Sequence, residues 1–194
     1  MSYLIKTVQP TSEPVTLAQM QLHLRLDTEG SPPSHPDDAL ITGLISAARE
    51  IVEIYTAFTL VETTYQCKEM MKNALVSLKT FPVLTIGSVT YQDSDDATQT
   101  INSSEYYIDN FKRPSLLRFK GDTVDKEITV TFTAGFTDGD EPNLFPMPQP
   151  LYSAIKLIVS DLYTNRESAS ENKRYTVPQS SEKLMNQYRI DMGT

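Results

Sequence analysis

The sequence predicts an α+β fold, in which a small bundle of three main helices carries an inserted, mostly antiparallel β-sheet or open barrel. Two observations predict it. Apolar residues recur at the helical period up to about residue 59 and again after residue 149, whereas they alternate with a period of two between residues 60 and 133. The 194 residues suffice for one domain, or for a helical part with a β insertion, and either can bury a core without disulfides.

The first helix is predicted to begin after Thr16, a residue type that caps helix N-termini through its side-chain oxygen. Its apolar residues occupy two sides of a helical wheel, with Leu22 and Leu26 almost opposite Leu17, Met20 and Leu24. A helix that is apolar on two sides is held from two sides. We therefore expect one side to face the core of its own chain. The side of Leu22 and Leu26 is expected to contact another element of the chain or a neighbouring subunit.

A second helix is predicted from Ala39 to about Phe58, with Asp37 or Asp38 as its cap. Its pattern is strongly amphipathic, so one face should be buried and the opposite face solvated. The buried face is expected to hold Leu40, Ile41, Leu44, Ala48, Ile51, Val52 and Tyr55. The solvated face is expected to hold Thr42, Ser46, Arg49, Glu50 and Glu53.

The middle of the chain is predicted to form six short strands. They are expected at residues 61–67, 74–78, 88–93, 105–110, 115–119 and 127–133. Polar segments at residues 93–98 and 119–127 are predicted to be turns. Cys67, the single cysteine, alternates onto one face with Tyr65, which predicts a small buried hydrophobic residue instead of a reactive thiol.

A third helix is predicted to begin near Pro150 and to pack beside the second helix. Its core stripe is expected to be Leu151, Ile155, Ile158, Val159 and Leu162. The composition turns polar after Glu167, with weak signals for a short fourth helix from Ser181 to Gln187. The chain thus divides into N-terminal helices (1–59), a β-rich insertion (60–149), a third helix (150–167) and a C-terminal tail (168–194).

No motif for catalysis or for cofactor binding is present in the sequence. The two histidines are far apart, and H-E-x-x-H, C-x-x-C, G-x-S-x-G and a Walker-type loop are all absent. Acidic groups at residues 93–96 and 138–141 lack the spacing of a calcium loop. We therefore expect no enzymatic activity, no metal and no cofactor, and favour a binding or structural role.

The charge and hydropathy of the sequence argue against two classes of partner, nucleic acids and membranes. The formal net charge is −8 and the sequence pI is about 4.8, which argues against a general grip on nucleic-acid phosphates. The first residues lack the pattern of a signal peptide, and no stretch reaches the roughly 20 apolar residues that span a membrane. We expect a protein made in a cytoplasm and no membrane partner.

Several phrases of the sequence follow one another in a characteristic order. They are "EPVTLAQMQLHLRLD", "DDALITGLISAAREIVEIYT", "FPVLTIGSVTYQDSD", "VTFTAGFTDG", a Pro-led helix ending "LYTNRES", and "VPQSSEKLMNQYRI". In this order and spacing the chain resembles the head-tail connector, or DNA-packaging adaptor, family of tailed bacteriophages. The resemblance runs from about Glu13 to Ile190. The loop at residues 31–36 and the approach to the third helix are longer than the family's pattern.

The resemblance implies a structural protein of the virion neck, assembled in the host cytoplasm. In that family, subunits form a ring, usually dodecameric, beneath the portal protein ring. The ring extends the DNA channel, through which DNA passes without specific binding, and carries a stopper or tail-completion protein. The family's C-terminal segment inserts against the portal, which implies portal-docking roles here for Val177, Leu184, Met185, Tyr188, Arg189 and Ile190.

Two alternatives to a connector remain open from the sequence. One is another structural protein of the virion, either a head-completion stopper or a tail-completion protein. The other is a cellular ligand-binding or hydrolytic β domain with helical flanks. A pocket with convergent polar groups would favour the cellular alternative.

Overall fold

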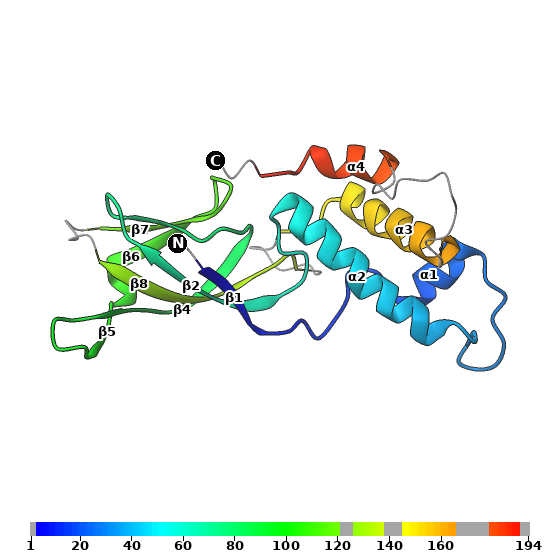
Figure 1. Cartoon of the computed structure of the whole chain (residues 1–194), viewed down its shortest axis with the longest axis horizontal. Helices are drawn as coiled ribbons and strands as arrows, with labels where there is room; N and C mark the ends of the chain where they lie inside the picture. The colour runs from blue at the N-terminus through cyan, green and yellow to red at the C-terminus, as the bar shows by residue number, and fades with distance from the viewer. Residues whose placement is uncertain (1–2, 121–125, 138–144, 166–178, 191–194) are drawn as a thin grey trace. The chain divides into compact units, whose positions relative to one another are not determined.

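The computed structural model describes residues 3–120, 126–137, 145–165 and 179–190. These residues form four α-helices and eight β-strands, which confirms the predicted α+β class. The chain divides into two compact units (Figure 1). The β unit comprises residues 1–11, 57–146 and 190–194, and the helical unit comprises residues 12–56 and 147–189.

The β unit contains two sheets in which all neighbouring strands are antiparallel. The larger sheet has the strand order β1 (Tyr3–Val8), β2 (Thr63–Met70), β8 (Glu127–Ala134), β4 (Val83–Gln92) and β5 (Thr98–Thr100). The smaller sheet has the order β3 (Leu75–Ser77), β7 (Leu116–Phe119) and β6 (Tyr106–Asp109). A short 3₁₀-helix, Ser103–Glu105, precedes β6.

The core of the β unit follows the period of two along its strands. In the central strand β8, Ile128, Val130 and Phe132 are buried and alternate with more exposed residues. Val130 lies opposite Cys67 of β2 and Val89 of β4, and all three are fully buried. The predicted role of Cys67 as a small core residue is confirmed.

All six predicted strands are present, with bounds shifted by a few residues, and two strands were not predicted. β1 pairs with β2 and forms one edge of the larger sheet. Its Leu4, Ile5 and Val8 are exposed, so β1 shows no alternating buried pattern that a sequence could reveal. β5 is a polar segment that pairs only with β4, across the predicted turn at residues 93–98. Most of the predicted turn at 119–127 lies outside the described residues.

The helical unit consists of α1 (Leu17–Leu24), α2 (Asp38–Thr56), α3 (Gln149–Thr164) and α4 (Gln179–Asn186). α3 packs against α2 as predicted, and α4 packs against α3 and α2 (Figure 1). The buried apolar side chains of the helical unit include Met20, Ile41, Ile45, Val52, Leu151, Ile155, Ile158 and Val159. α4 begins two residues before the predicted start, and Ser181 lies buried inside it.

The predicted solvated face of α2 is wrong at two positions. Arg49 and Glu53 are 3% and 7% exposed, whereas Leu40, predicted to be buried, is 40% exposed. Ile45, which was not assigned to the buried face, is 2% exposed. The buried face of α2 is therefore rotated toward Arg49 and Glu53, because these charges are neutralised by partners inside the unit.

Candidate interaction surfaces

α1 is held at both ends by local backbone chemistry. The Thr16 hydroxyl accepts a hydrogen bond from the backbone N–H of Gln19 (3.2 Å), and the Gln19 side chain accepts one from the backbone N–H of Thr16 (3.1 Å). This reciprocal pair is a capping box, so the predicted Thr16 cap is confirmed. Arg25 ends the helix in the left-handed conformation, with φ 55°.

The side of α1 that carries Leu22, predicted to contact another element or a neighbouring subunit, lies at the surface of the helical unit. Leu22 is 82% exposed, and Leu26 is half-buried. A groove of about 480 Å³ lies beside these two residues, and it is lined chiefly by apolar side chains. We call it the α1 groove; its lining includes Leu17, Leu22, Leu26, Thr28, Pro32 and Pro33. Leu17, predicted on the side opposite Leu26, lines the same groove, because the helix ends before Leu26.

The loop that forms the far wall of the α1 groove is fastened to the helices. Glu29 and Ser34 exchange two backbone hydrogen bonds of 3.0 and 2.8 Å. The Asp38 carboxylate accepts one hydrogen bond from the Gln21 side-chain amide (2.6 Å) and one from the backbone N–H of His35 (2.9 Å). These contacts hold the wall in place, so the groove is a formed feature of the surface.

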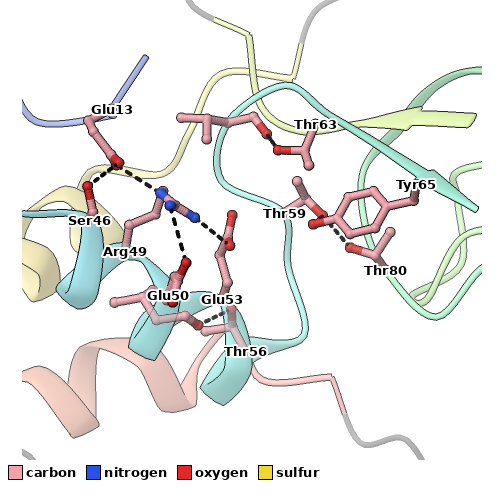
Figure 2. Close-up of polar contacts among 12 residues, drawn as sticks. Glu13, Ser46, Arg49, Glu50, Glu53, Thr56, Thr59, Thr63, Tyr65 and Thr80 are labelled. Atoms are coloured by element: carbon pink, nitrogen blue, oxygen red, sulfur yellow. Dashed lines mark hydrogen bonds and ion pairs between the residues drawn. The ribbon is translucent and has the colours of Figure 1, made fainter. Parts of the chain in front are cut away.

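A buried ionic cluster joins the segment before α1 to α2 (Figure 2). The Arg49 guanidinium donates to Glu13 (Nε to Oε2, 2.8 Å) and to Glu53 (Nη1 to Oε2, 2.9 Å). Its Nη2 lies 3.7 Å from a carboxylate oxygen of Glu50, and the Ser46 hydroxyl donates to Glu13 (2.7 Å). Burial alone lowers the pKa of Arg49, but the carboxylates of Glu53 and Glu13 outweigh it and raise that pKa above the ordinary value.

The Arg49 cluster is a structural element of the helical unit. Its guanidinium is paired on both sides, as a buried charge requires, and the Glu13 contact fixes the chain just before the α1 cap. Sequence periodicity alone could not find it, because a buried salt bridge and a solvated polar face have the same residue types. The proximity of Glu13 to α2 arises only from the tertiary fold.

α4 is docked on the helical unit through one aromatic residue of α2. The Tyr55 hydroxyl donates to the Asn186 side chain (2.6 Å), and it lies 3.3 Å from a carboxylate oxygen of Glu182. The Arg189 guanidinium lies over the Tyr55 ring, 5.4 Å from its centroid. Met185 is fully buried. Met185 therefore anchors α4 to its own unit.

The other predicted portal-docking residues differ in exposure. Leu184 and Tyr188 are half-buried, and Arg189 is exposed. Ile190 is buried. Val177 lies outside the described residues. Leu184, Tyr188 and Arg189 thus remain the members of the predicted set with surface to offer a partner.

A loop of the β unit carries an exposed aromatic side chain that the sequence did not single out. Phe111 is 104% exposed, the highest value among the large apolar residues described. Asn110, its neighbour, donates to the carbonyl of Val83 (2.7 Å) and accepts from the Ser115 hydroxyl (2.6 Å). Arg113 lies over the Phe81 ring at 4.8 Å. We call residues 109–115 the Phe111 loop.

The β unit also contains a buried cluster of hydroxyl groups (Figure 2). Thr59 and Thr80 share a hydrogen bond of 2.7 Å between their hydroxyls, and Thr59 donates to the Tyr65 hydroxyl at 3.2 Å. All three residues are buried. The cluster is self-satisfied within the unit, so it has the form of a structural network.

The described residues contain no group of three or more His, Cys, Asp or Glu side chains that could hold a metal ion. The Asp93 carboxylate accepts the backbone N–H groups of Asp95 and Ala97, both at 3.0 Å, so it closes the β4–β5 turn. The acidic group at 138–141 lies outside the described residues. None of the helices among the described residues has the length and the apolar character needed to span a membrane.

Three solved structures are similar to the chain over nearly its whole length. "Neck of empty GTA particle computed with C6 symmetry" contains a chain with a TM-score of 0.74 and 18% identity, and the alignment covers 99% of this chain and 97% of that one. "Virion of native gene transfer agent (GTA) particle" gives a TM-score of 0.73, 18% identity and coverage of 98% and 97%. "Neck of native GTA particle computed with C12 symmetry" gives 0.68, 17%, and 99% and 97%.

The chain therefore has the fold of chains found in gene transfer agent particles, two of them in the neck. This agrees at the level of the fold with the resemblance to the head-tail connector family. No protein-family model matches the chain, and no curated protein sequence matches it.

Proposed function

We propose that this chain is a non-catalytic ring subunit in the neck of a tailed phage or phage-like particle, where it connects the portal to the tail. The observation that carries the proposal is the fold shared with neck chains over 99% of this chain and 97% of theirs. Both units take part in that similarity. Those necks were computed with C6 and C12 symmetry, which supports a ring of copies here as well.

The exposed side of α1 supports assembly. An apolar groove with Leu22 and Leu26 at its wall is a surface that a neighbouring subunit would cover. In a closed ring each copy contributes one surface to the copy before it and a different surface to the copy after it. We assign the α1 groove to one of these two surfaces.

The charge of the chain suits a channel through which DNA moves. Twelve copies at −8 each would carry a formal charge of −96. Acidic groups along a channel repel the phosphate backbone, so DNA would slide through without adhering. This part of the proposal requires that some of the carboxylates face the channel.

The C-terminal segment is our candidate for portal docking. Met185 and the Tyr55 hydrogen bonds hold α4 on its own unit, and we assign the half-buried Leu184 and Tyr188 and the exposed Arg189 to the portal contact. A short amphipathic helix needs only a few apolar anchors to dock in a groove. Val177, upstream of α4, belongs to the same proposed docking segment.

Native mass spectrometry of the purified chain, alone and mixed with the portal ring from the same genome, tests the proposal. We expect stoichiometric addition of a ring of copies to the portal. The double substitution Leu184→Ala and Tyr188→Ala should abolish this addition while circular dichroism stays unchanged, and Gln187→Ala, at an exposed neighbouring position, is the matched control.

Two results would change the assignment. A chain that forms rings but ignores the portal would be a stopper or tail-completion protein. Undiminished addition of the double variant would remove α4 from portal docking.

A further inference from the structure

We propose that the Phe111 loop of one copy inserts its aromatic ring into the α1 groove of the next copy. The inference rests on the proposed ring and deepens it, because it names the two surfaces that meet between neighbouring subunits. The occupant of the groove is therefore a second copy of this chain.

The Phe111 loop has the properties of a preorganised anchor. Phe111 is fully exposed, although the residues around it are tightly bonded. Its backbone N–H donates to the Asp109 carboxylate (3.1 Å), which also accepts from Arg118 (2.7 Å), and Asn110 is tied to Val83. A braced loop loses little conformational entropy on binding, and a fully exposed phenyl ring gains a large buried area when a pocket receives it.

The α1 groove has the size and chemistry to receive that ring. Its volume of about 480 Å³ exceeds what one phenyl side chain fills, and Leu17, Leu22, Leu26 and two prolines supply apolar walls. The Asp38 contacts fix the loop wall before any partner arrives. Aromatic side chains seated in such preformed apolar pockets commonly dominate the energetics of protein interfaces.

Charges on the two surfaces are complementary. Phe111 is followed directly by Lys112 and Arg113, both exposed, in a chain whose net charge is negative. Asp27 and Glu29, also exposed, flank the α1 groove and line the neighbouring depression of about 500 Å³. Lys112 beside the anchor would therefore lie near Asp27 and Glu29 beside the groove, and this attraction favours the pairing.

The two surfaces belong to different places on the chain, so their contact is heterologous. A heterologous contact repeats from copy to copy and produces a ring when the rotation closes. The ring symmetry of the similar neck structures agrees with a contact of this type.

The test is disulfide trapping between two single-cysteine substitutions of the full-length chain. Phe111→Cys in one preparation and Leu22→Cys in a second, mass-tagged preparation are mixed and oxidised. We expect a reducible heterodimer in the mixture and in neither variant alone. Cys67 stays in place because it is fully buried, and the wild-type chain controls for it. Phe111→Cys mixed with Ile54→Cys, which is 83% exposed on α2, is the matched control for random collision.

Charge reversal provides an independent readout. Lys112→Glu or Glu29→Lys alone should raise the concentration needed for half-assembly about tenfold, and the double variant should recover wild-type assembly. Equal trapping by the Leu22→Cys and Ile54→Cys partners would overturn the proposed contact, and so would a double charge variant that assembles no better than the single variants.

Rings that form from wild-type chain without Phe111–Leu22 trapping would also overturn the proposed contact, while leaving the proposed function intact. A chain that neither assembles alone nor adds to the portal would overturn the proposed function itself.

Discussion

The two units of this chain both bury polar side chains, but they do so with different chemistry. The helical unit buries an ionised group, the Arg49 guanidinium, between Glu13 and Glu53. The β unit buries neutral hydroxyls, with Thr59 bonded to Thr80 and Tyr65. Losing one partner of a buried charge leaves an uncompensated ion, whereas losing one hydroxyl leaves an unpaired neutral dipole. The units should therefore differ in how strongly one polar substitution destabilises them.

The largest effect is expected from Arg49→Ala. The substitution leaves the buried Glu53 carboxylate and the partly buried Glu13 carboxylate without their cation, so the free energy of unfolding should fall by about 3–5 kcal/mol. Denaturant unfolding followed by circular dichroism measures the loss, and hydrogen exchange of α2 amides assigns it to the helical unit. Glu50→Gln is the control, because Glu50 is exposed and its contact is 3.7 Å long. Equal effects of the two substitutions would contradict the buried cluster.

The next largest effects are expected at two glycines, where substitution by alanine should change the stability of the two units in opposite directions. Gly135 has φ +141°, and a Cβ there would lie 2.5 Å from the backbone of Val61, so Gly135→Ala should destabilise the β unit by about 2–3 kcal/mol. Gly43 lies on α2 with open space around it, so Gly43→Ala should stabilise the helical unit by about 0.5–1 kcal/mol. Thermal unfolding of both variants measures the effects. The two shifts must have opposite signs, and equal signs would refute the assigned environments.

Thr59→Val should have a smaller effect than Arg49→Ala. The substitution keeps the shape of the side chain and removes the hydroxyl that joins Thr80 to Tyr65, at a cost of about 1–2 kcal/mol in the free energy of unfolding. Thr85→Val is the matched control, because Thr85 bonds Thr133 on an exposed face of the sheet. Denaturant unfolding compares the two variants. A loss for Thr59→Val as large as that for Arg49→Ala would remove the distinction between ionic and neutral burial.

The smallest effect concerns pH and a partly buried ion pair of the β unit. The hydrogen bond from Arg118 holds the pKa of Asp109 below its ordinary value. A depressed carboxyl pKa stabilises the folded state above the unfolded pKa of about 3.9, and this contribution is lost as the pH falls through the folded pKa. In Arg118→Gln the pKa of Asp109 should rise toward its ordinary value, as measured by NMR titration of the side-chain carboxyl.

Asp93 is the internal control for that titration. Its pKa is also lowered, but chiefly by the hydrogen bond from Gln99, so Arg118→Gln should leave it unchanged. An unchanged pKa of Asp109 in the variant would show that Arg118 is not the cause.

Sequence periodicity predicted the β unit well for a physical reason. Its six predicted strands carry alternating side chains because one face of each packs on a core, as Val130 and Phe132 do in β8. β1 and β5 lie at the edges of the larger sheet, where no face needs to be apolar throughout, so their sequences carry no such signal. Pairing with β2 and β4 defines them instead.

The helical unit was predicted less completely. The Thr16 cap and the exposed side of α1 follow from local sequence, because capping and helical periodicity are local properties. The burial of Arg49 depends on Glu13, which is distant in sequence, so no pattern within α2 reveals it. No local pattern predicts the exposure of Phe111 either, because the exposure of a single aromatic residue in a loop is a property of the folded surface.

The most direct test of the central claim is electron cryomicroscopy of particles assembled in cells that produce a tagged copy of this chain, reconstructed at the neck without imposed symmetry. We predict a closed ring of copies between the portal and the tail, with Leu184 and Tyr188 turned toward the portal. Tagged chain in the tail alone, or particles that lack the chain entirely, would contradict the account.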